Sequence, residues 1–292
     1  MTKLLLIDGN AVLHRAYHAL PGSLTTKDGE PINAVYGFVS MLVKIIEEQK
    51  PTHIAVAFDT PVETFRKAEY VGYQINRPRL HSDLSSQFEI CYKVLDAMNI
   101  PIYKVERYEA DDVIGTIANQ GSGLVKELLI VTGDRDLLQL VDDKKNIKVW
   151  MPIQGINKAK VYTEKEVIER MGVKANQIVD YKALAGDSSD NYPGVTGIGP
   201  KGAIGLLEKY STLENIYKNI NEIPPKVATK LAVGAESSAM SKHLATIVRD
   251  VPVTFHLADS AKWDVKSQKV LDVFASIGFK TLTNRVKQLS LI

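Results

Sequence analysis

Short apolar runs alternate with longer amphipathic stretches through the first two-thirds of the chain. The apolar runs are typical of buried strands, and the stretches around 35–46 and 84–98 repeat apolar residues every three or four positions, as amphipathic helices do. We therefore expect strands at 4–7, 54–58, 128–131 and, more weakly, 147–151. Strands that alternate with helices predict an α/β fold with a parallel sheet and right-handed crossovers.

After about residue 160 strand signals nearly vanish, and turns rich in Gly, Pro, Asn and Ser separate short helical patterns. The helices are expected at 164–171, 177–184, 201–208, 213–219 and 270–277. This change predicts a soft boundary near Gly172, with one domain over 1–171 and a helical one over 172–292.

The composition is that of an ordinary soluble globular protein. Of 292 residues, 45% are hydrophobic and 24% charged, which excludes disorder and collagen-like repeats. No stretch approaches the roughly 18 apolar residues of a membrane span, and the first residues read as a strand and not as a secretory signal. Cys91 is the single cysteine, so neither an internal disulfide nor a Cys-rich zinc site can form. It lies on the apolar stripe of 84–98, which predicts a core residue in a reducing cytoplasm.

Acidic residues follow the ends of predicted strands. Asp8, Asp59 and Asp134 each come directly or closely after an apolar run. The carboxyl ends of parallel strands meet at one edge of a sheet, so these carboxylates should converge. Further acids stand in tight clusters, at Glu109, Asp111 and Asp112 where a helix begins, at Asp136, and at Asp187 and Asp190 in Gly-Asp-Ser-Ser-Asp-Asn.

Nine carboxylates at one edge would repel each other unless cations were bound. Oxygen ligands without Cys or His select hard ions, Mg²⁺ or Mn²⁺. Two such ions, roughly 4 Å apart, would activate water and stabilise the leaving oxygen of a phosphodiester. Each piece also has a structural interpretation, as a helix cap, as compensation of a helix dipole or as an Asx turn. Their joint occurrence favours a catalytic metal site formed by all nine acids.

A glycine-rich loop spans 193–202. Its Gly197, Gly199 and Gly202 formally match the dinucleotide fingerprint, but no strand precedes them, which argues against a nicotinamide oxidoreductase. The loop instead predicts a hairpin between two helices whose backbone approaches a DNA phosphate, with Lys201 as an added cation. Such a contact positions a duplex without reading its sequence. A plain helix–helix turn is the alternative.

Basic and aromatic residues interleave between 61 and 81. This pattern suits single-stranded nucleic acid, because rings stack on bases and cations meet phosphates. A solvated loop with its rings on the core is the alternative. The segment follows Asp59, so it should overhang the acidic edge. Its bases and rings are Phe65, Arg66, Lys67, Tyr70, Tyr73, Arg77 and Arg79.

Together these motifs resemble the 5′-nuclease family, which comprises the flap endonucleases and the 5′→3′ exonuclease domain of bacterial DNA polymerase I. The matching residues run in family order over nearly the whole chain. They are Leu6-Ile-Asp-Gly-Asn-Ala11 with His14-Arg15, Phe58-Asp59 with Thr64-Phe-Arg66, Tyr108-Glu-Ala-Asp-Asp112, Thr132-Gly-Asp-Arg-Asp-Leu137, and Gly186-Asp-Ser-Ser-Asp-Asn191 leading to Pro193-Gly and Gly197-Ile-Gly-Pro-Lys201.

The resemblance implies a PIN-like sheet core with a helical arch over 1–171 and a DNA-binding helical subdomain over 172–292. A helix-three-turn-helix element is expected near 185–210, with K⁺ on the backbone carbonyls of Val195, Gly197 and Gly199. The implied activity is hydrolysis of DNA at 5′ ends, flaps and single-strand/double-strand junctions, in primer or flap removal during replication and repair. The implied setting is a monomer in the bacterial cytoplasm, associated with the nucleoid and not with a membrane, and acting with a linked or separate DNA polymerase.

One position departs from the family pattern. The family usually has Tyr-Lys-x-x-Arg at the base of the arch, and this chain has Tyr73 and Gln74, with Arg77 kept as the catalytic and DNA-binding arginine. Losing a cation from a developing charge costs on the order of 10² to 10³ in rate. A weakened nuclease that binds DNA junctions is therefore the first alternative, and a PIN-type ribonuclease is the second.

Overall fold

A six-stranded sheet forms the centre of the computed structural model, which describes residues 2–76, 81–154 and 158–289. Its strand order is β3-β2-β1-β4-β5-β6, and all neighbouring pairs are parallel except β5 and β6. The strands are β1 (Lys3–Asp8), β2 (His53–Ala57), β3 (Ile102–Tyr103), β4 (Glu127–Val131), β5 (Ile147–Gln154) and β6 (Lys158–Tyr162). The predicted α/β class is confirmed, and the antiparallel β6 makes the sheet mixed.

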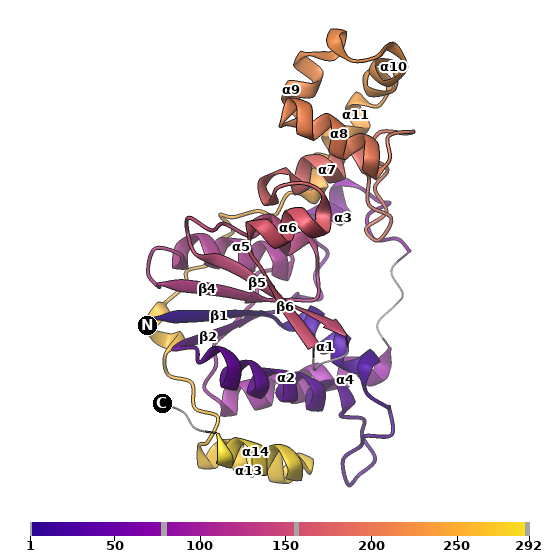
Figure 1. Ribbon diagram of the computed structural model, residues 1–292. Helices are drawn as coiled ribbons and strands as arrows, with labels where there is room; N and C mark the ends of the chain where they lie inside the picture. The colour runs from indigo at the N-terminus through magenta and orange to yellow at the C-terminus, as the bar shows by residue number, and fades with distance from the viewer. Residues whose placement is uncertain (1, 77–80, 155–157, 290–292) are drawn as a thin grey trace.

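Helices cover both faces of this sheet (Figure 1). In β1, Leu4 and Leu6 face one apolar core while Leu5 and Ile7 face the other, which explains why the run is apolar throughout. The helices of the N-terminal part are α1 (Gly9–Ala19), α2 (Asn33–Gln49), α3 (Phe65–Glu69), α4 (Ser82–Ala97), α5 (Ala110–Gly121) and α6 (Glu164–Met171), with a 3₁₀ turn η1 (Asp136–Leu140). Cys91 on α4 is buried in one of the cores, as predicted.

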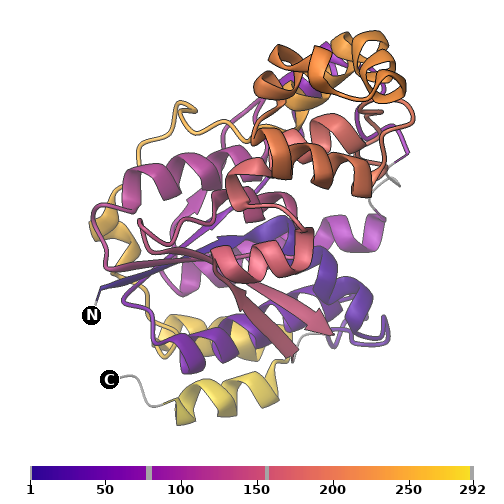
Figure 2. The same cartoon turned by 45° about the horizontal axis from the view of Figure 1, so that its top comes forward.

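A group of short helices stands at one end of the sheet (orange in Figures 1 and 2). It follows Gly172, which ends α6 in the left-handed region at φ 73°. The group contains η2 (Ala175–Gln177), α7 (Ile178–Ala185), α8 (Pro200–Tyr210), α9 (Leu213–Lys218), η3 (Ile220–Glu222), α10 (Pro225–Val233) and α11 (Ala235–Ala245). The domain boundary near Gly172 stays a prediction.

The C-terminal helices return to the sheet. After α12 (Leu257–Ser260), α13 (Gln268–Ile277) packs on α4 and α14 (Lys280–Gln288) packs on α2. These last two helices, yellow in Figures 1 and 2, lie far from α8–α11. Phe274 and Phe279 join the apolar core that α1, α2 and α4 form beneath β1. In the described parts of the chain, no helix is long and apolar enough to span a membrane.

Candidate active site

A cleft of about 1260 Å³ opens at the carboxyl edge of the sheet. Seven of the nine predicted acids line it, namely Asp8, Asp59, Glu109, Asp111, Asp134, Asp136 and Asp190. The fold brings them together because β1, β2 and β4 are parallel neighbours that end at the same edge. Asp112 and Asp187 are not among its lining residues.

Asp8 links the ends of the two central strands. It closes β1 and caps α1, where its carboxylate accepts a hydrogen bond from the Ala11 amide at 2.9 Å. The Thr132 hydroxyl, just after β4, donates to the same carboxylate at 2.7 Å, and the Asp134 amide donates to that hydroxyl at 2.9 Å. Asp8 is only 3% exposed, so this network fixes it at the cleft wall.

Asp59 ties the end of β2 to the start of α5. Its carboxylate accepts a hydrogen bond from the Ala110 amide at 2.7 Å, and its own amide donates to the Asn10 side chain at 2.9 Å. Asp59 therefore satisfies a free N–H group in the first turn of α5. This contact places Asp59 beside Glu109 and Asp111, which flank Ala110 in sequence and also line the cleft.

Asp136, Asp187 and Asp190 form a second acidic group. One carboxylate oxygen from each lies within 4.8 Å of the others, close enough for one ion to bind all three. The Lys182 ammonium, on α7, donates to both Asp136 and Asp187 and is only 6% exposed. Lys182 is a site residue that the sequence reasoning missed. Its signal was a lysine in the apolar helix directly before Gly-Asp-Ser-Ser-Asp.

Asp112 instead anchors a buried arginine. Both of its oxygens accept hydrogen bonds from the Arg66 guanidinium at 2.7 Å, and the amides of Val248 and Glu109 donate to it as well. Asp112 is fully buried, with 0% exposure. The sequence predicts a metal ligand here, but protein donors already fill this carboxylate, so the contacts favour a structural role.

Arg66 also differs from its expected place. It is 2% exposed, and besides Asp112 it donates to Glu109 at 3.1 Å and to the carbonyls of Leu244 and Thr246. These contacts use all five guanidinium N–H groups. No donor is left for a DNA phosphate. Arg66 instead joins α3 to α5, to the last turn of α11 and to the residue that follows it.

The predicted DNA-contact residues between 61 and 81 lie in different environments. Tyr73 is buried and donates to Glu109 at 3.2 Å, so it supports an acid and is not a free stacking platform. Gln74 lines the cleft, with a backbone φ of 53°, and its amide side chain donates to Asp190 at 3.1 Å. Lys67 is exposed at the cleft. Arg77 lies outside the described residues.

The cleft favours protonated acids when no cation balances them. Burial is the largest cause, and it raises the pKa of Asp8 to about 7, of Glu109 to about 7 and of Asp136 to about 6. Burial, followed by the neighbouring charges of Asp134 and Asp8, also raises the pKa of Asp111 well above its ordinary value. Burial would raise the pKa of Asp187 too, but the Lys182 ammonium lowers it. The excess negative charge of these acids, once they are ionised, thus suits a divalent cation.

These shifts predict how stability depends on pH in excess chelator. The acids titrate near pH 6 to 7 when folded and near 4 when unfolded. Between these values the folded state binds more protons, so the free energy of unfolding should fall as pH rises. Urea unfolding should show about 1–3 kcal/mol more stability at about pH 5.5 than at about pH 7.5.

Added Mg²⁺ should weaken or reverse this dependence, because metal ions bind ionised carboxylates. The same titration with Mg²⁺ is therefore the matched control. Stability that rises with pH in chelator would contradict the raised pKa values of the buried acids.

The glycine loop forms the predicted hairpin between α7 and α8. Gly194 and Gly197 have φ of 62° and 82°, and a Cβ on Gly194 would lie 2.3 Å from the Gly186 nitrogen. Gly199 precedes Pro200, the first residue of α8, and Lys201 and Gly202 are exposed in the first turn. The loop thus presents a helix N-terminus and a cation to solvent, and its contact with DNA stays a prediction.

The carbonyls expected to bind K⁺ already accept hydrogen bonds. Val195 accepts from the Ile198 amide at 2.9 Å and Gly199 from the Ala203 amide at 3.0 Å. Gly197 accepts from the Lys230 ammonium at 2.9 Å. A potassium ion on Gly197 would therefore have a fixed positive charge as its neighbour, so the donor set does not suit K⁺ well.

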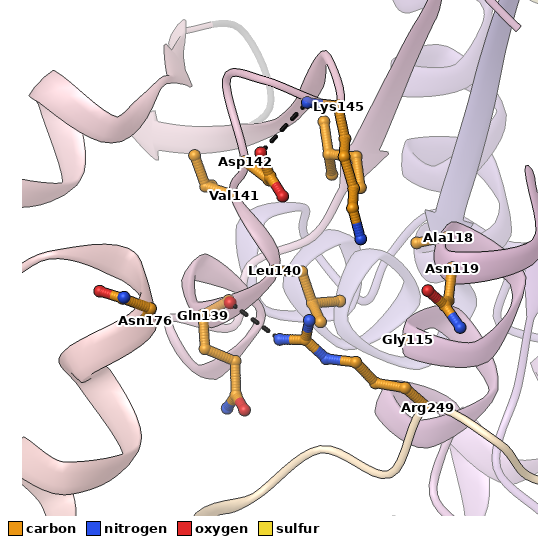
Figure 3. A pocket seen from close by; sticks show the side chains of 11 residues that line it. Gly115, Ala118, Asn119, Gln139, Leu140, Val141, Asp142, Lys145, Asn176 and Arg249 are labelled. Atoms are coloured by element: carbon orange, nitrogen blue, oxygen red, sulfur yellow. Dashed lines mark hydrogen bonds between the residues drawn. The ribbon is translucent and has the colours of Figure 1, made fainter. Parts of the chain in front are cut away.

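A second, much smaller pocket of about 100 Å³ lies beside α5 and η1 (Figure 3). Lys145 and Arg249 point into it, and Arg249 donates to the Gln139 carbonyl at 3.1 Å. None of the nine acids lines this pocket. The predicted acidic site therefore lies in the large cleft and not in this pocket.

Two models of known protein families match this chain. The family model described as "5'-3' exonuclease, N-terminal resolvase-like domain" matches residues 3–172. The chain belongs to the 5′–3′ exonuclease family. A second model, "5'-3' exonuclease, C-terminal SAM fold", matches residues 173–269 of this exonuclease. The predicted family, fold and 5′-nuclease class of the enzyme are confirmed.

Relatives of this chain carry the name DNA polymerase I. That of Caldicellulosiruptor bescii is 44% identical over 286 residues, which cover 97% of this chain and 33% of the relative. That of Bacillus subtilis is 39% identical over 285 residues, covering 97% and 32%. The exonuclease chain thus spans about a third of the length of the curated relatives it matches.

Solved structures share the fold of the exonuclease at low sequence identity. The bacteriophage T5 D15 flap endonuclease, in a "pseudo-enzyme-product complex with DNA and metal ions", has a TM-score of 0.70, 18% identity and coverage of 98% and 97% of the two chains. The catalytic core of Rad2 in complex with DNA has a TM-score of 0.61, 15% identity and coverage of 100% and 93%.

Proposed function

We propose that this chain hydrolyses DNA phosphodiesters at 5′ ends, flaps and single-strand/double-strand junctions by a two-metal-ion mechanism. The observation that carries the proposal is the convergence of seven acids from separate elements in one cleft. A cleft built to bind DNA without reacting would have little use for so much buried negative charge beside a polyanion. The T5 relative, whose structure contains DNA and metal ions, supports the same function.

The cleft offers two groups of oxygen ligands for Mg²⁺ or Mn²⁺. Asp8 and Asp134 line the cleft with Asp111, whose pKa their charges help to raise, and these three would hold one ion. Asp59 and Glu109 lie on the same cleft wall. Asp136, Asp187 and Asp190 would hold the other. Ions bound there would supply Lewis acidity for an attacking water and a leaving oxygen.

The protein's own residues orient the acids. Thr132 fixes the Asp8 carboxylate, and Arg66, itself fixed by Asp112, donates to Glu109. Tyr73 donates to the same Glu109 oxygen, so two donors set its direction. Lys182 balances Asp136 and Asp187. We infer that Asp112, Arg66, Tyr73 and Lys182 are positioning residues and that Lys67, Arg77, Gly197, Gly199, Lys201 and Gly202 contact DNA.

A product-length assay on a 5′-flap duplex tests the function. With Mg²⁺, the chain should cut the flap strand near the junction, which releases the flap with a 3′-hydroxyl and leaves a 5′-phosphate on the duplex product, and excess chelator should stop the reaction. Binding without cleavage in Mg²⁺ and Mn²⁺ would favour the junction-binding alternative. Faster cleavage of an RNA flap than of a DNA flap would favour the ribonuclease.

Substituting Gln74 by lysine should raise the single-turnover cleavage rate without much tightening of substrate binding. Gln74 lies at the cleft and beside Asp190, so a cation there would meet more charge in the transition state than in the ground state. The gain should be on the order of tenfold or more. The comparison is with Lys67→Ala: an unchanged rate for Gln74→Lys and a collapse for Lys67→Ala would show that Lys67 already supplies the cation.

The setting of the enzyme is part of the proposal. Because its relatives are named DNA polymerase I, we propose that the chain acts with a linked or separate polymerase in replication and repair. We also propose a monomer in the bacterial cytoplasm, associated with the nucleoid. Size-exclusion chromatography with light scattering tests the monomer.

A further inference from the structure

We propose that the ammonium of Lys230, and not a potassium ion, is the cation of the glycine hairpin that grips duplex DNA. This inference rests on the proposed function, since it concerns the DNA-binding element of the same enzyme. Lys230 lies on α10, 33 residues beyond the hairpin, and its ammonium donates to the Gly197 carbonyl at 2.9 Å. That carbonyl is the middle one of the three at which the resemblance places K⁺.

The hairpin is shaped to receive this side chain. Gly197 has a φ of 82°, and a Cβ built there would lie 3.0 Å from the Lys230 ammonium and 3.1 Å from its Cε atom. The lysine thus runs along the face of the glycine. Any other residue would be strained at this φ, and its Cβ would force the lysine side chain to shift by a few tenths of an ångström, so the glycine provides both the turn and the space for the cation.

The backbone of α10 and α11 is fixed to the hairpin independently of Lys230. The Ser237 hydroxyl donates to the Gly194 carbonyl at 2.7 Å, and the Gly194 amide donates to the Ser241 hydroxyl at 3.1 Å. A Cβ on Gly234 would lie 2.8 Å from the Val195 side chain, which shows how closely the end of α10 approaches. The backbone that carries Lys230 is therefore held at the hairpin before DNA binds.

Lys230 also keeps donors for a ligand. An ammonium has three N–H donors, and among the described residues Lys230 makes one hydrogen bond, to Gly197. The residue is exposed, so two donors face solvent at the hairpin. A DNA phosphate at the hairpin would meet these donors, the exposed Lys201 and the start of α8. A tethered ammonium supplies the positive charge without recruiting an ion from solution.

The test compares DNA binding in salts of different cations. A labelled 5′-flap duplex is titrated with the whole chain, followed by fluorescence anisotropy, in chelator and at one ionic strength of KCl, NaCl or tetramethylammonium chloride. Wild-type affinity should be equal in the three salts. Lys230→Met should weaken binding roughly threefold to tenfold and lower the salt slope by about one. K⁺ should then restore part of the binding, since the Gly197 carbonyl has lost its cation.

The matched control is Lys226→Met, one helical turn earlier on the same exposed helix and with the same loss of charge. It should weaken binding less and equally in all salts. Thermal unfolding midpoints close to wild type show that each variant folds.

Wild-type binding that is several-fold tighter in KCl than in NaCl would assign the role to potassium and overturn the inference. Lys230→Met that binds like wild type in every salt, or no worse than Lys226→Met, would also overturn it. If only this inference fails, the wild type should still cleave the flap duplex in the presence of Mg²⁺. A wild type that neither binds nor cleaves the flap duplex overturns the proposed function and this inference together.

Discussion

Replacing Asp134 by alanine should lower the single-turnover rate of flap cleavage by about 10³-fold or more. Asp134 lies in the cleft at the end of β4, and its charge is one of the causes that raise the pKa of Asp8, Asp111 and Asp136. Its charge therefore acts on acids of both groups. Removing it should also weaken metal affinity, measured by Mn²⁺ titration, while relieving repulsion in the metal-free protein.

The control is Asp272→Ala, an exposed acid on α13 that bonds only to Gln268 among the contacts of the described chain. Its rate and Mn²⁺ affinity should match wild type. Undiminished turnover of Asp134→Ala, or full wild-type activity in excess chelator, would overturn the metal assignment.

Arg66→Met should be the most destabilising of the substitutions considered, at about 3–5 kcal/mol of unfolding free energy. The change leaves the Asp112 carboxylate buried with no counter-charge, and it frees the carbonyls of Leu244 and Thr246. Urea unfolding measures the loss. Activity should fall as well, because Glu109 loses one of its two side-chain donors.

Two comparisons separate the buried charge from loss of packing. Arg285→Met breaks a half-exposed ion pair with Glu47 and a weak contact with Ser40, and it should cost only about 1 kcal/mol. Adding Asp112→Asn to Arg66→Met removes the unpaired charge and should recover part of the stability. A double variant less stable than Arg66→Met alone would mean that Asp112 is not the source of the cost.

Local pattern predicted most of the sheet and its acidic edge. The strands at 4–7, 54–58 and 128–131 are buried on both faces, so their apolar runs are unambiguous. In contrast, β3 is only two residues long, and β6 reads Lys-Ala-Lys-Val-Tyr, which hides an edge strand behind its charges. The serines of α11 similarly hide a packed helix, since Ser238 and Ser241 are buried through hydrogen bonds.

The roles of individual side chains in the cleft could not be read from residue order. Asp111 and Asp112 are neighbours in sequence, yet one lines the cleft and the other meets Arg66, which is 46 positions away. Lys182 reaches Asp136 across the same number of positions. Such pairings depend on how α3, α5, α7 and η1 pack together, which no short motif encodes. The nuclease class was therefore predictable, while the division between metal ligands and supporting residues was not.

The strand order also sets when the enzyme can assemble. β1 lies between β2 and β4, and Lys3 pairs with Glu127, so β1 stays half-paired until more than a hundred further residues have been synthesised. Closing so long a loop delays the final pairing. Until β4 arrives, the apolar run of β1 presents an open strand edge, where a growing chain is exposed to aggregation. Because Asp8 and Thr132 meet only after that pairing, the acidic edge of the sheet cannot form before β4 is in place.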